Sequence, residues 1–227
     1  MRKPVSYRKD IPFFCNKSER DFRRDVYERY DTMVTRQSAL HLADEVWGMY
    51  PMQRVFDFAH DYYPDSSIHN ILEIGCGVGR WIASLAQMYP QTDCWGLDYS
   101  YQMLRQANEF WVLGKEISLD LSRKGFPRAL YLQGHQLANV KLGLAKATDL
   151  PFSDSSQDLI VSRFLFDRLD SPDECLDEIY RILRPNGRLI LVTPLNFDQA
   201  TLWERFYPPI KIHEILLQKG FSLLEWN

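Results

Sequence analysis

The sequence predicts an α/β fold, a mostly parallel sheet with helices on both faces, preceded by a helical N-terminal extension. Short apolar segments alternate with amphipathic ones from residue 71 onward, as in consecutive βαβ units. Three glycines, Gly75, Gly77 and Gly79, lie between the first apolar segment and the first amphipathic one. The 227 residues, 45% of them hydrophobic, are enough for one domain with a buried core.

The first 67 residues are predicted to form the extension, a lid packed on the core. Residues 1–17 look irregular. Apolar and aromatic side chains at helical spacing, with Ser18 as a possible N-cap, predict helices in the rest of the extension. These predicted helices cover residues 18–35, 38–50 and 52–62.

Residues 68–227 are predicted to form the α/β domain. Its predicted strands are residues 71–74, 94–97, 140–145, 158–161, 188–192 and 221–226. Its predicted helices are residues 80–89, a segment that Ser100 can cap, 173–183 and 210–219. Two segments break the regular alternation, residues 114–139 and 194–209.

Charge and cysteine content exclude several classes of function. Net charge is −3, but residues 1–36 hold ten Lys or Arg against six Asp or Glu, a surplus of four, so the remainder carries −7. This basic segment is either a phosphate-binding arm or, more simply, a solvated helix with interleaved charges. We expect no nucleic-acid partner. The four cysteines are isolated, which predicts neither a metal site nor a disulfide framework.

The sequence also bears on location. No apolar run approaches the roughly 20 residues that span a bilayer, so we expect no membrane span. Residues 1–10 lack the apolar core of a secretory signal, and we therefore expect a cytoplasmic protein.

The glycine cluster is the strongest functional signal. In an open α/β sheet, ligands bind beyond the carboxyl ends of the strands, where the strand order reverses. Glycines there permit positive φ and let the backbone approach a ligand closely. Asp98, 98 − 75 = 23 residues after Gly75, ends the next predicted strand, where its carboxylate can accept hydrogen bonds from ribose hydroxyls.

The spacing of the glycines favours one class of cofactor. A dinucleotide fingerprint needs a third glycine at the position that Arg80 occupies. The observed pattern has an acid, Glu73, two residues before Gly75 and glycines at every second position. A mononucleotide with a short amino-acid tail fits this loop better than a dinucleotide.

The chain resembles class I S-adenosylmethionine-dependent methyltransferases, in the small-molecule branch that includes ubiquinone and menaquinone methyltransferases. Five ordered segments carry the resemblance: residues 71–80, 96–104, 150–152, 158–161 and 182–189. It implies a Rossmann-like fold over residues 68–226, S-adenosylmethionine as cofactor and a small-molecule methyl acceptor. A rival hypothesis keeps the fold and the cofactor without catalysis, as a partner or regulatory protein.

The resemblance also implies residue roles. Glu73 supports the loop and the methionine end of the cofactor, which Gly75 and Gly77 contact through their backbone. Asp98 holds the ribose.

At the adenine end, the resemblance implies that Tyr99 and Met103 flank the base, although Met103 suits core packing equally well. Many relatives place an Asp where this sequence has Lys146, and an ammonium cannot accept a hydrogen bond from the adenine amino group. The backbone of Ala147 can recognise adenine instead. Asp149 is either a substitute for the missing acid or a turn residue.

The acceptor side is less specific. Methyl transfer from a sulfonium is an in-line displacement that depends on alignment, and a general base is optional. Asp167 is a candidate base, with local capping or pairing as the simpler role. Arg163 either binds an anionic acceptor or forms a surface ion pair. Tyr27 lies in a segment resembling one that covers the cofactor in relatives.

Two further expectations concern the edges of the site and of the sheet. The aromatic segment 203–207 is a candidate wall of the acceptor pocket. Relatives end with a strand hairpin after the segment matching residues 220–226, and here only Asn227 follows. An open sheet edge makes a homodimer possible.

Overall fold

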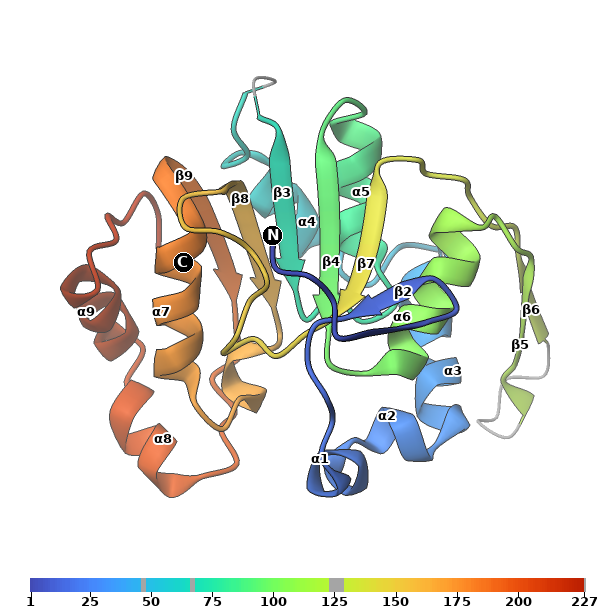
Figure 1. Cartoon of the computed structure of the whole chain (residues 1–227), viewed down its shortest axis with the longest axis horizontal. Helices are drawn as coiled ribbons and strands as arrows, with labels where there is room; N and C mark the ends of the chain where they lie inside the picture. The colour runs from blue at the N-terminus through green and yellow to red at the C-terminus, as the bar shows by residue number, and fades with distance from the viewer. Residues whose placement is uncertain (46–47, 66–67, 123–128, 227) are drawn as a thin grey trace.

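A seven-stranded sheet forms the centre of the molecule, in the order β1-β2-β7-β4-β3-β8-β9 (Figure 1). The computed structural model describes residues 1–45, 48–65, 68–122 and 129–226. Every described pairing in this sheet is parallel except that of β1 with β2. The predicted Rossmann-like, mostly parallel sheet is therefore confirmed.

Five parallel strands match the predicted apolar segments. They are β3 (Asn70–Ile74), β4 (Asp93–Asp98), β7 (Val140–Leu144), β8 (Gln157–Arg163) and β9 (Leu183–Val192). The chain moves from β3 outward through β4 to β7, then returns to the other side of β3 for β8 and β9. The strand order thus reverses at β3, directly before the glycine cluster, which is where such sheets bind ligands.

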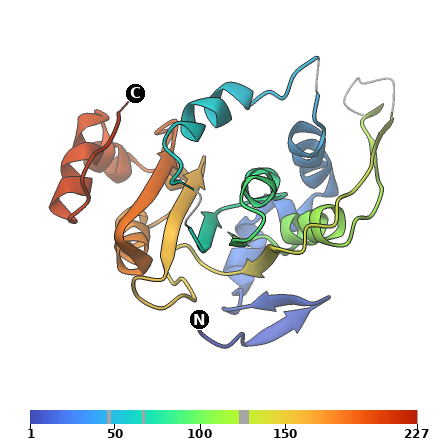
Figure 2. The ribbon, with the colours of Figure 1, turned by 90° about the horizontal axis from the view of Figure 1, so that it is seen from above.

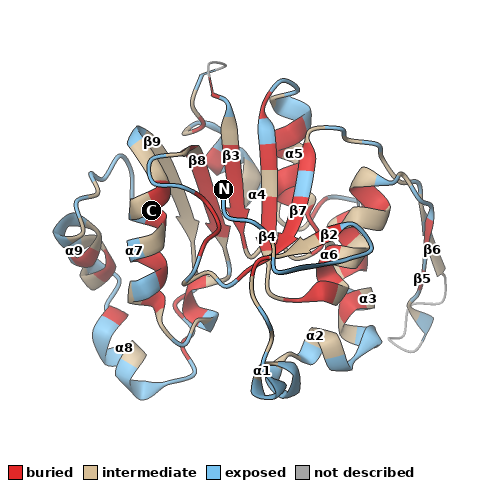
Figure 3. Ribbon diagram, viewed as in Figure 1, coloured by how far each residue is buried: buried red, intermediate tan, exposed pale blue. Residues whose placement is uncertain are grey.

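Alternate residues of each central strand pack into two separate cores. Ile71 joins the core beneath α3 (Asp31–Leu42), α5 (Arg80–Met88) and α6 (Tyr101–Ala107). Leu72 and Ile74 join the core beneath α7 (Pro172–Ile182) and α9 (Ile210–Gln218). Figure 2 shows helices on the two sides of the sheet, and Figure 3 shows the central strands as the most buried part. This alternation is the period-two pattern of a sheet covered on both faces.

The prediction that residues 1–17 are irregular is wrong. Residues Ser6–Arg8 (β1) and Ile11–Phe13 (β2) form a hairpin, and Phe13 pairs in parallel with Leu144 at the edge of the sheet. The two-residue turn, Lys9 and Asp10, has positive φ at both positions, as a tight hairpin turn requires. The sequence does not reveal these strands because three residues are too short to show a periodic pattern. The N-terminal extension is therefore not only helical.

The single predicted helix over 18–35 is also wrong. The structure has three helices, α1 (Glu19–Arg24), α2 (Val26–Arg29) and α3, with breaks at Asp25 and Tyr30. Ser18 caps α1 as predicted, through a capping box with Asp21. Asp25 interrupts the helix because its carboxylate accepts hydrogen bonds from the backbone of residues 27 and 28.

Of the second and third predicted helices, the structure confirms only the third. Helix α3 ends at Leu42, so the helix predicted over residues 38–50 does not extend through residues 43–45 and 48–50, and residues 46–47 lie outside the described part. The third predicted helix is confirmed as α4 (Gln53–His60).

The two irregular segments hold their own structure. Strands β5 (Ile117–Asp120) and β6 (Ala129–Leu132) form a separate antiparallel pair, and α8 (Ala200–Phe206) lies in the second segment. The strand predicted over residues 221–226 is wrong, because those residues form no strand and β9 is the edge of the described sheet. Their alternating apolar pattern finds no neighbouring strand with which to pair.

No helix among the described residues has the length and apolar character needed to cross a membrane. All four cysteines are free thiols, and Cys76, Cys94 and Cys175 are buried. The described residues contain no group of side chains that could hold a metal ion.

Candidate cofactor and acceptor site

The glycine loop joins the end of β3 to the start of α5 and turns sharply. Gly75, Gly77 and Gly79 all have positive φ, between 54° and 79°. The amides of Gly75 and Cys76 donate to the carbonyl of Leu97 at 2.7 and 3.0 Å, which fastens the loop to the end of β4. The predicted need for glycine in this loop is confirmed at all three positions.

Asp98 lies at the end of β4, against this loop. Its Oδ2 accepts from the backbone amide of Gly77 at 2.8 Å, and its Oδ1 accepts from that of Ser100 at 2.7 Å. Burial raises the pKa of Asp98, while both hydrogen bonds oppose the shift. Each oxygen of the carboxylate has a second lone pair, so the group can still accept from two hydroxyls.

Glu73 is fully buried beneath the loop. Its Oε2 accepts from the backbone amide of Ile82 in the first turn of α5 at 2.8 Å. Its Oε1 is buried without a hydrogen-bond partner among the described residues. Burial raises the pKa of Glu73 to about 7, against the opposing charge of Arg163. A buried, incompletely bonded carboxylate under a glycine loop is unusual for a purely structural residue.

Tyr99 and Met103 follow Asp98 in the sequence, Tyr99 directly after strand β4 and Met103 in helix α6. The Tyr99 hydroxyl donates to Asp21 Oδ2 at 2.8 Å, and Lys17 Nζ and Lys146 Nζ lie 4.9 and 5.7 Å from the centre of its ring. The buried Met103 side chain packs against the loop, where its methyl carbon would lie 3.6 Å from a Cβ placed on Gly77. Met103 therefore combines core packing with contact to the loop.

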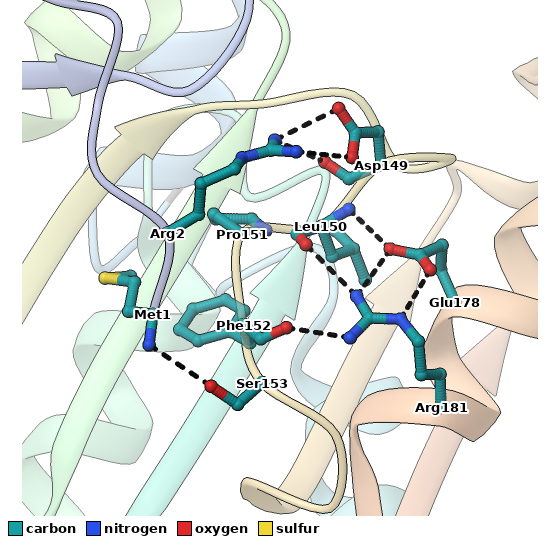
Figure 4. Close-up of a pocket in the computed structure, with 9 residues that line it drawn as sticks. All are labelled: Met1, Arg2, Asp149, Leu150, Pro151, Phe152, Ser153, Glu178 and Arg181. Atoms are coloured by element: carbon teal, nitrogen blue, oxygen red, sulfur yellow. Dashed lines mark hydrogen bonds and ion pairs between the residues drawn. The ribbon is translucent and has the colours of Figure 1, made fainter.

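The acid missing at Lys146 is not replaced by Asp149. The Asp149 carboxylate binds the guanidinium of Arg2 at 2.7 and 3.0 Å, on the wall of a surface pocket (Figure 4). Ala147 is half-buried in the turn beside it and packs against the α7 core. The acid that does face Tyr99 is Asp21, from a segment far away in the sequence.

The pocket in Figure 4 is separate from the glycine loop. Its lining comes from the N-terminus, residues 149–153 and helix α7. There Arg181 donates to Glu178 and to the carbonyls of Leu150 and Phe152. These contacts attach α7 to the loop after β7, so the pocket is lined by groups that already have partners.

The N-terminal extension covers the end of the sheet where Asp98 lies, and Figure 1 shows α1 and α2 beyond the carboxyl ends of the strands. Lys17, whose side chain is 4% exposed, forms ion pairs with Asp25 at 2.6 Å and Glu28 at 3.2 Å. Glu28 in turn accepts from the backbone amide of Tyr101 at 2.7 Å. The pKa of the half-buried Tyr27 is raised by burial and then by the charge of Asp98.

Asp167 is buried in a short 3₁₀ turn, Phe166–Arg168, after β8. Its Oδ1 accepts from the Thr193 hydroxyl at 3.2 Å, and its Oδ2 accepts from the Asn196 amide at 3.1 Å. These contacts attach the turn to the segment after β9, which is the local role weighed against catalysis. Its role as a base stays a prediction.

The aromatic segment 203–207 packs largely onto itself and its neighbours. Phe206 is fully buried and lies 5.1 and 5.4 Å from the ring centres of Phe166 and Phe197. Trp203 donates its indole N–H to the carbonyl of Phe197 at 2.7 Å. Phe206 therefore belongs to the α7 core, whereas Trp203 and Tyr207 are exposed, and the segment as a wall of the acceptor pocket stays a prediction.

Arg163, at the end of β8, is not on the surface. Its side chain is 8% exposed, and its Nη1 donates to the Tyr50 hydroxyl at 3.2 Å. Its Nη2 lies 3.9 Å from Glu73 Oε1, and its guanidinium carbon lies 5.0 Å from the centre of the Trp81 ring. Of the two roles expected for Arg163, the surface ion pair is therefore wrong, since the nearest carboxylate among the described residues is buried, and binding of an anionic acceptor stays a prediction. Sequence reasoning missed Tyr50 because the contact joins segments 113 residues apart.

With this geometry established, comparison with known proteins decides the family. A family described as a methyltransferase domain matches residues 72–191, more than half of the chain. The chain belongs to this methyltransferase family. The matched residues include the glycine loop, Asp98 and strand β8, and the resemblance found in the sequence is confirmed.

Two curated relatives illustrate the range of the family. The chain is 30% identical over 136 residues to a malonyl-[acyl-carrier protein] O-methyltransferase of Methylococcus capsulatus, covering 59% of this chain and 39% of that protein. It is 27% identical over 146 residues to a demethylmenaquinone methyltransferase of Lactiplantibacillus plantarum, covering 62% and 53%. The chain thus spans less than two thirds of the length of either relative.

A solved structure shows the same fold. Phosphoethanolamine N-methyltransferase 2 of Haemonchus contortus, in complex with S-adenosyl-L-methionine, superposes with a TM-score of 0.61 at 19% identity, over 93% of this chain and 46% of that one. The methyltransferase family assignment supports S-adenosylmethionine as the cofactor, as the glycine spacing predicts.

Proposed function

We propose that this methyltransferase transfers the methyl group of S-adenosylmethionine to a small-molecule acceptor by in-line displacement. The observation that carries the proposal is the joined loop and carboxylate, in which Gly77 donates to Asp98 at the point where the strand order reverses. This arrangement supports the proposal because the loop backbone can approach a ligand closely and the adjacent carboxylate can accept hydrogen bonds from ribose hydroxyls.

The described residues fit this cofactor. Glu73 has an unpartnered buried oxygen that can accept from an ammonium group, such as that of the methionine end. Gly75 and Gly77 would contact that end, Asp98 would hold the ribose, Tyr99 and Met103 would flank the base, and the backbone of Ala147 would receive it. The cofactor supplies an already activated methyl group. The residues of this chain bind it, align it and exclude water.

The identity of the acceptor does not follow from the relatives, whose names give different substrates. We propose a small molecule rather than nucleic acid because several of the basic N-terminal residues already pair with acidic side chains of the same chain. Lys17 and Arg24 are paired with acidic side chains of the same chain, at 2.6 Å to Asp25 and 2.8 Å to Asp170. The cytoplasmic location stays a prediction.

Asp98→Ala tests the cofactor site. We expect S-adenosylmethionine to bind roughly 10- to 150-fold more weakly, since hydrogen bonds to a charged group contribute roughly 1.5–3 kcal/mol. Asp93→Ala is the matched control, because Asp93 starts the same strand at its opposite end and pairs with Lys141. Calorimetry with S-adenosylmethionine, S-adenosylhomocysteine and NAD measures both. Equal affinity of the two variants, or tight binding of NAD alone, would contradict the proposal.

Binding without turnover distinguishes the rival hypothesis, a non-catalytic protein with the same fold. A methyl-labelled cofactor incubated with a metabolite extract reports transfer directly. Binding of the cofactor with no labelled product from any fraction would favour the rival.

We also propose that the open edge of β9 permits a homodimer. Residues 189–192 of this strand are half-exposed, and β9 has no second neighbour in the described sheet. Light scattering over a wide concentration range tests this, and a monomer throughout would contradict it.

A further inference from the structure

A nearly buried cationic cluster joins the end of β8 to the N-terminal extension. Its centre is the guanidinium of Arg163, which lies between the Tyr50 hydroxyl, the rings of Trp81 and Phe164, and Glu73. We infer that Arg163 binds a carboxylate of the methyl acceptor, so that the substrate is a small organic acid. This inference rests on the proposed methyl transfer and names the substrate class of that site.

The position of Arg163 is that of an acceptor-side residue. Ile74 pairs with Ser162, so Gly75 and Arg163 come next on the two neighbouring strands, at the carboxyl edge of the sheet. Leu165, two residues later, packs against Gly75 so closely that a Cβ there would lie 3.0 Å from its Cδ2. The end of β8 is therefore in contact with the glycine loop that we propose holds the methyl donor.

The hydrogen bonding of Arg163 leaves capacity for a ligand. A guanidinium has five N–H donors, and the Tyr50 hydroxyl is the one acceptor that the described residues give it at hydrogen-bond distance. The separation of 3.9 Å from Glu73 Oε1 exceeds the 2.7–2.9 Å of a charge-assisted hydrogen bond. Glu73 Oε1 is itself buried and unpartnered. The two groups lie next to each other, and neither satisfies the hydrogen bonding of the other.

The charge of the cluster favours an anion. Arg80, the other guanidinium here, stacks on the Tyr50 ring at 4.7 Å and is paired with Asp44 at 2.8 Å. Among the described residues, Glu73 is the one acidic side chain within 4.0 Å of the Arg163 guanidinium, and it makes no hydrogen bond to it. One incompletely balanced positive charge remains in a nearly buried position, where an arriving anion is favourable.

The planar shape of the guanidinium favours a carboxylate over other anions. A planar guanidinium presents parallel N–H groups that match the two oxygens of a carboxylate. A phosphate monoester brings close to two negative charges, which one guanidinium beside an acidic residue leaves partly unbalanced.

Tyr50 and His41 hold the guanidinium in place. Burial and the nearby charges of Arg163 and Arg80 lower the pKa of His41 to about 3, so its imidazole is neutral. Neutral Nδ1, 3.2 Å from the Tyr50 oxygen, can accept the phenolic proton while that oxygen accepts from Arg163. The chain of hydrogen bonds fixes the side chain that is to receive the acid.

The test compares matched acids and amides. Thermal unfolding of the full chain, with and without saturating S-adenosylhomocysteine, is measured with acetate or benzoate and with acetamide or benzamide at equal ionic strength. We expect the acids to raise the melting temperature and the amides not to. Arg163→Gln should weaken binding of the acids tenfold or more. Arg205→Gln, at an exposed ion pair with Asp173, is the control and should bind them as the wild type does.

Two results would overturn the inference: amides that bind the wild type as well as acids, or Arg163→Gln that binds acids unchanged. Should Arg163→Gln fail to fold, Arg163→Lys is tested instead, because it keeps the positive charge and loses the paired N–H donors of the guanidinium. Unchanged affinity of this variant for the acids would contradict two-point binding of the carboxylate.

A second measurement separates this inference from the proposed function. A metabolite extract is divided on an anion-exchange resin and each fraction is incubated with methyl-labelled cofactor. We expect the label in the retained, acidic fraction. Label confined to the unretained fraction overturns the acid substrate and supports methyl transfer. Arg163-dependent binding of acids by a protein that does not bind S-adenosylmethionine supports the anion site and overturns the proposed function.

Discussion

At the scale of single residues, Glu73 links stability to pH. It is fully buried, and its pKa of about 7 lies above the 4.5 of an ordinary glutamate. The folded state therefore holds this proton more tightly than the unfolded state does. Its contribution to the free energy of unfolding falls as the pH rises from 4.5 to about 7, then stays constant.

Glu73→Gln should remove this effect. We expect the variant to gain up to about 3 kcal/mol over the wild type between pH 4.5 and 7, because a neutral amide carries no buried charge and its carbonyl can still accept from Ile82. Urea unfolding at several pH values measures it. Glu178→Gln is the control with the opposite sign, since Arg181 lowers the pKa of Glu178. Parallel pH curves for Glu73→Gln and the wild type would refute the assignment.

Gly48 and Gly75 have similar positive φ angles but different surroundings. Comparing their replacement by Ala separates the cost of backbone strain from the cost of steric crowding. Gly48 has φ of 85°, and no atom of the described residues would lie within 4 Å of a Cβ there, whereas Gly75 has φ of 74° and a Cβ there would lie 3.0 Å from Leu165. We expect Gly48→Ala to cost roughly 1 kcal/mol and Gly75→Ala roughly 2–3 kcal/mol of unfolding free energy. Chemical denaturation compares them. Equal costs would show that Leu165 simply moves aside.

At the scale of elements, Asp25 both starts α2 and pairs with a buried lysine. Its carboxylate accepts from the amides of Tyr27 and Glu28 and from Lys17. Asp25→Asn keeps the cap and loses the charge, and Asp25→Ala loses both. We expect Asp25→Ala to be the less stable variant by about 1 kcal/mol. Equal stability, measured by thermal unfolding, would mean that the cap contributes nothing.

Elements with strong local signals were predictable. Strands β3 and β4 lie where their short apolar runs predict buried parallel strands, and helix α5 lies where apolar residues recur at helical spacing. The β1–β2 hairpin was not predictable, since three residues carry no period and its stability comes from the edge of β7. The false strand at residues 221–226 is the converse, a pattern without a partner.

At the scale of the whole molecule, Phe14 attaches the N-terminus to the sheet. It is 3% exposed, and its amide donates to the carbonyl of Leu144 at 2.8 Å. Phe14→Ala should cost roughly 3–5 kcal/mol, the usual loss for a buried Phe. Phe22, 46% exposed on α1, is the matched control, and its replacement by Ala should cost less than about 1 kcal/mol. Urea unfolding that gives similar losses would show that the N-terminus is not part of the cooperative unit.

The sequence by itself determined the parallel sheet, the glycine loop and Asp98. The alternation of strand and helix patterns, the three glycines and the acid that ends the next strand can each be recognised in short contiguous segments. Only the tertiary structure decided that Asp21 faces Tyr99, that Asp149 is bound to Arg2, and that Arg163 lies beside Glu73 and Tyr50. Those contacts join segments that are distant along the chain. The packing of the N-terminal extension onto the ends of the strands brings many of them together, and no local pattern encodes it.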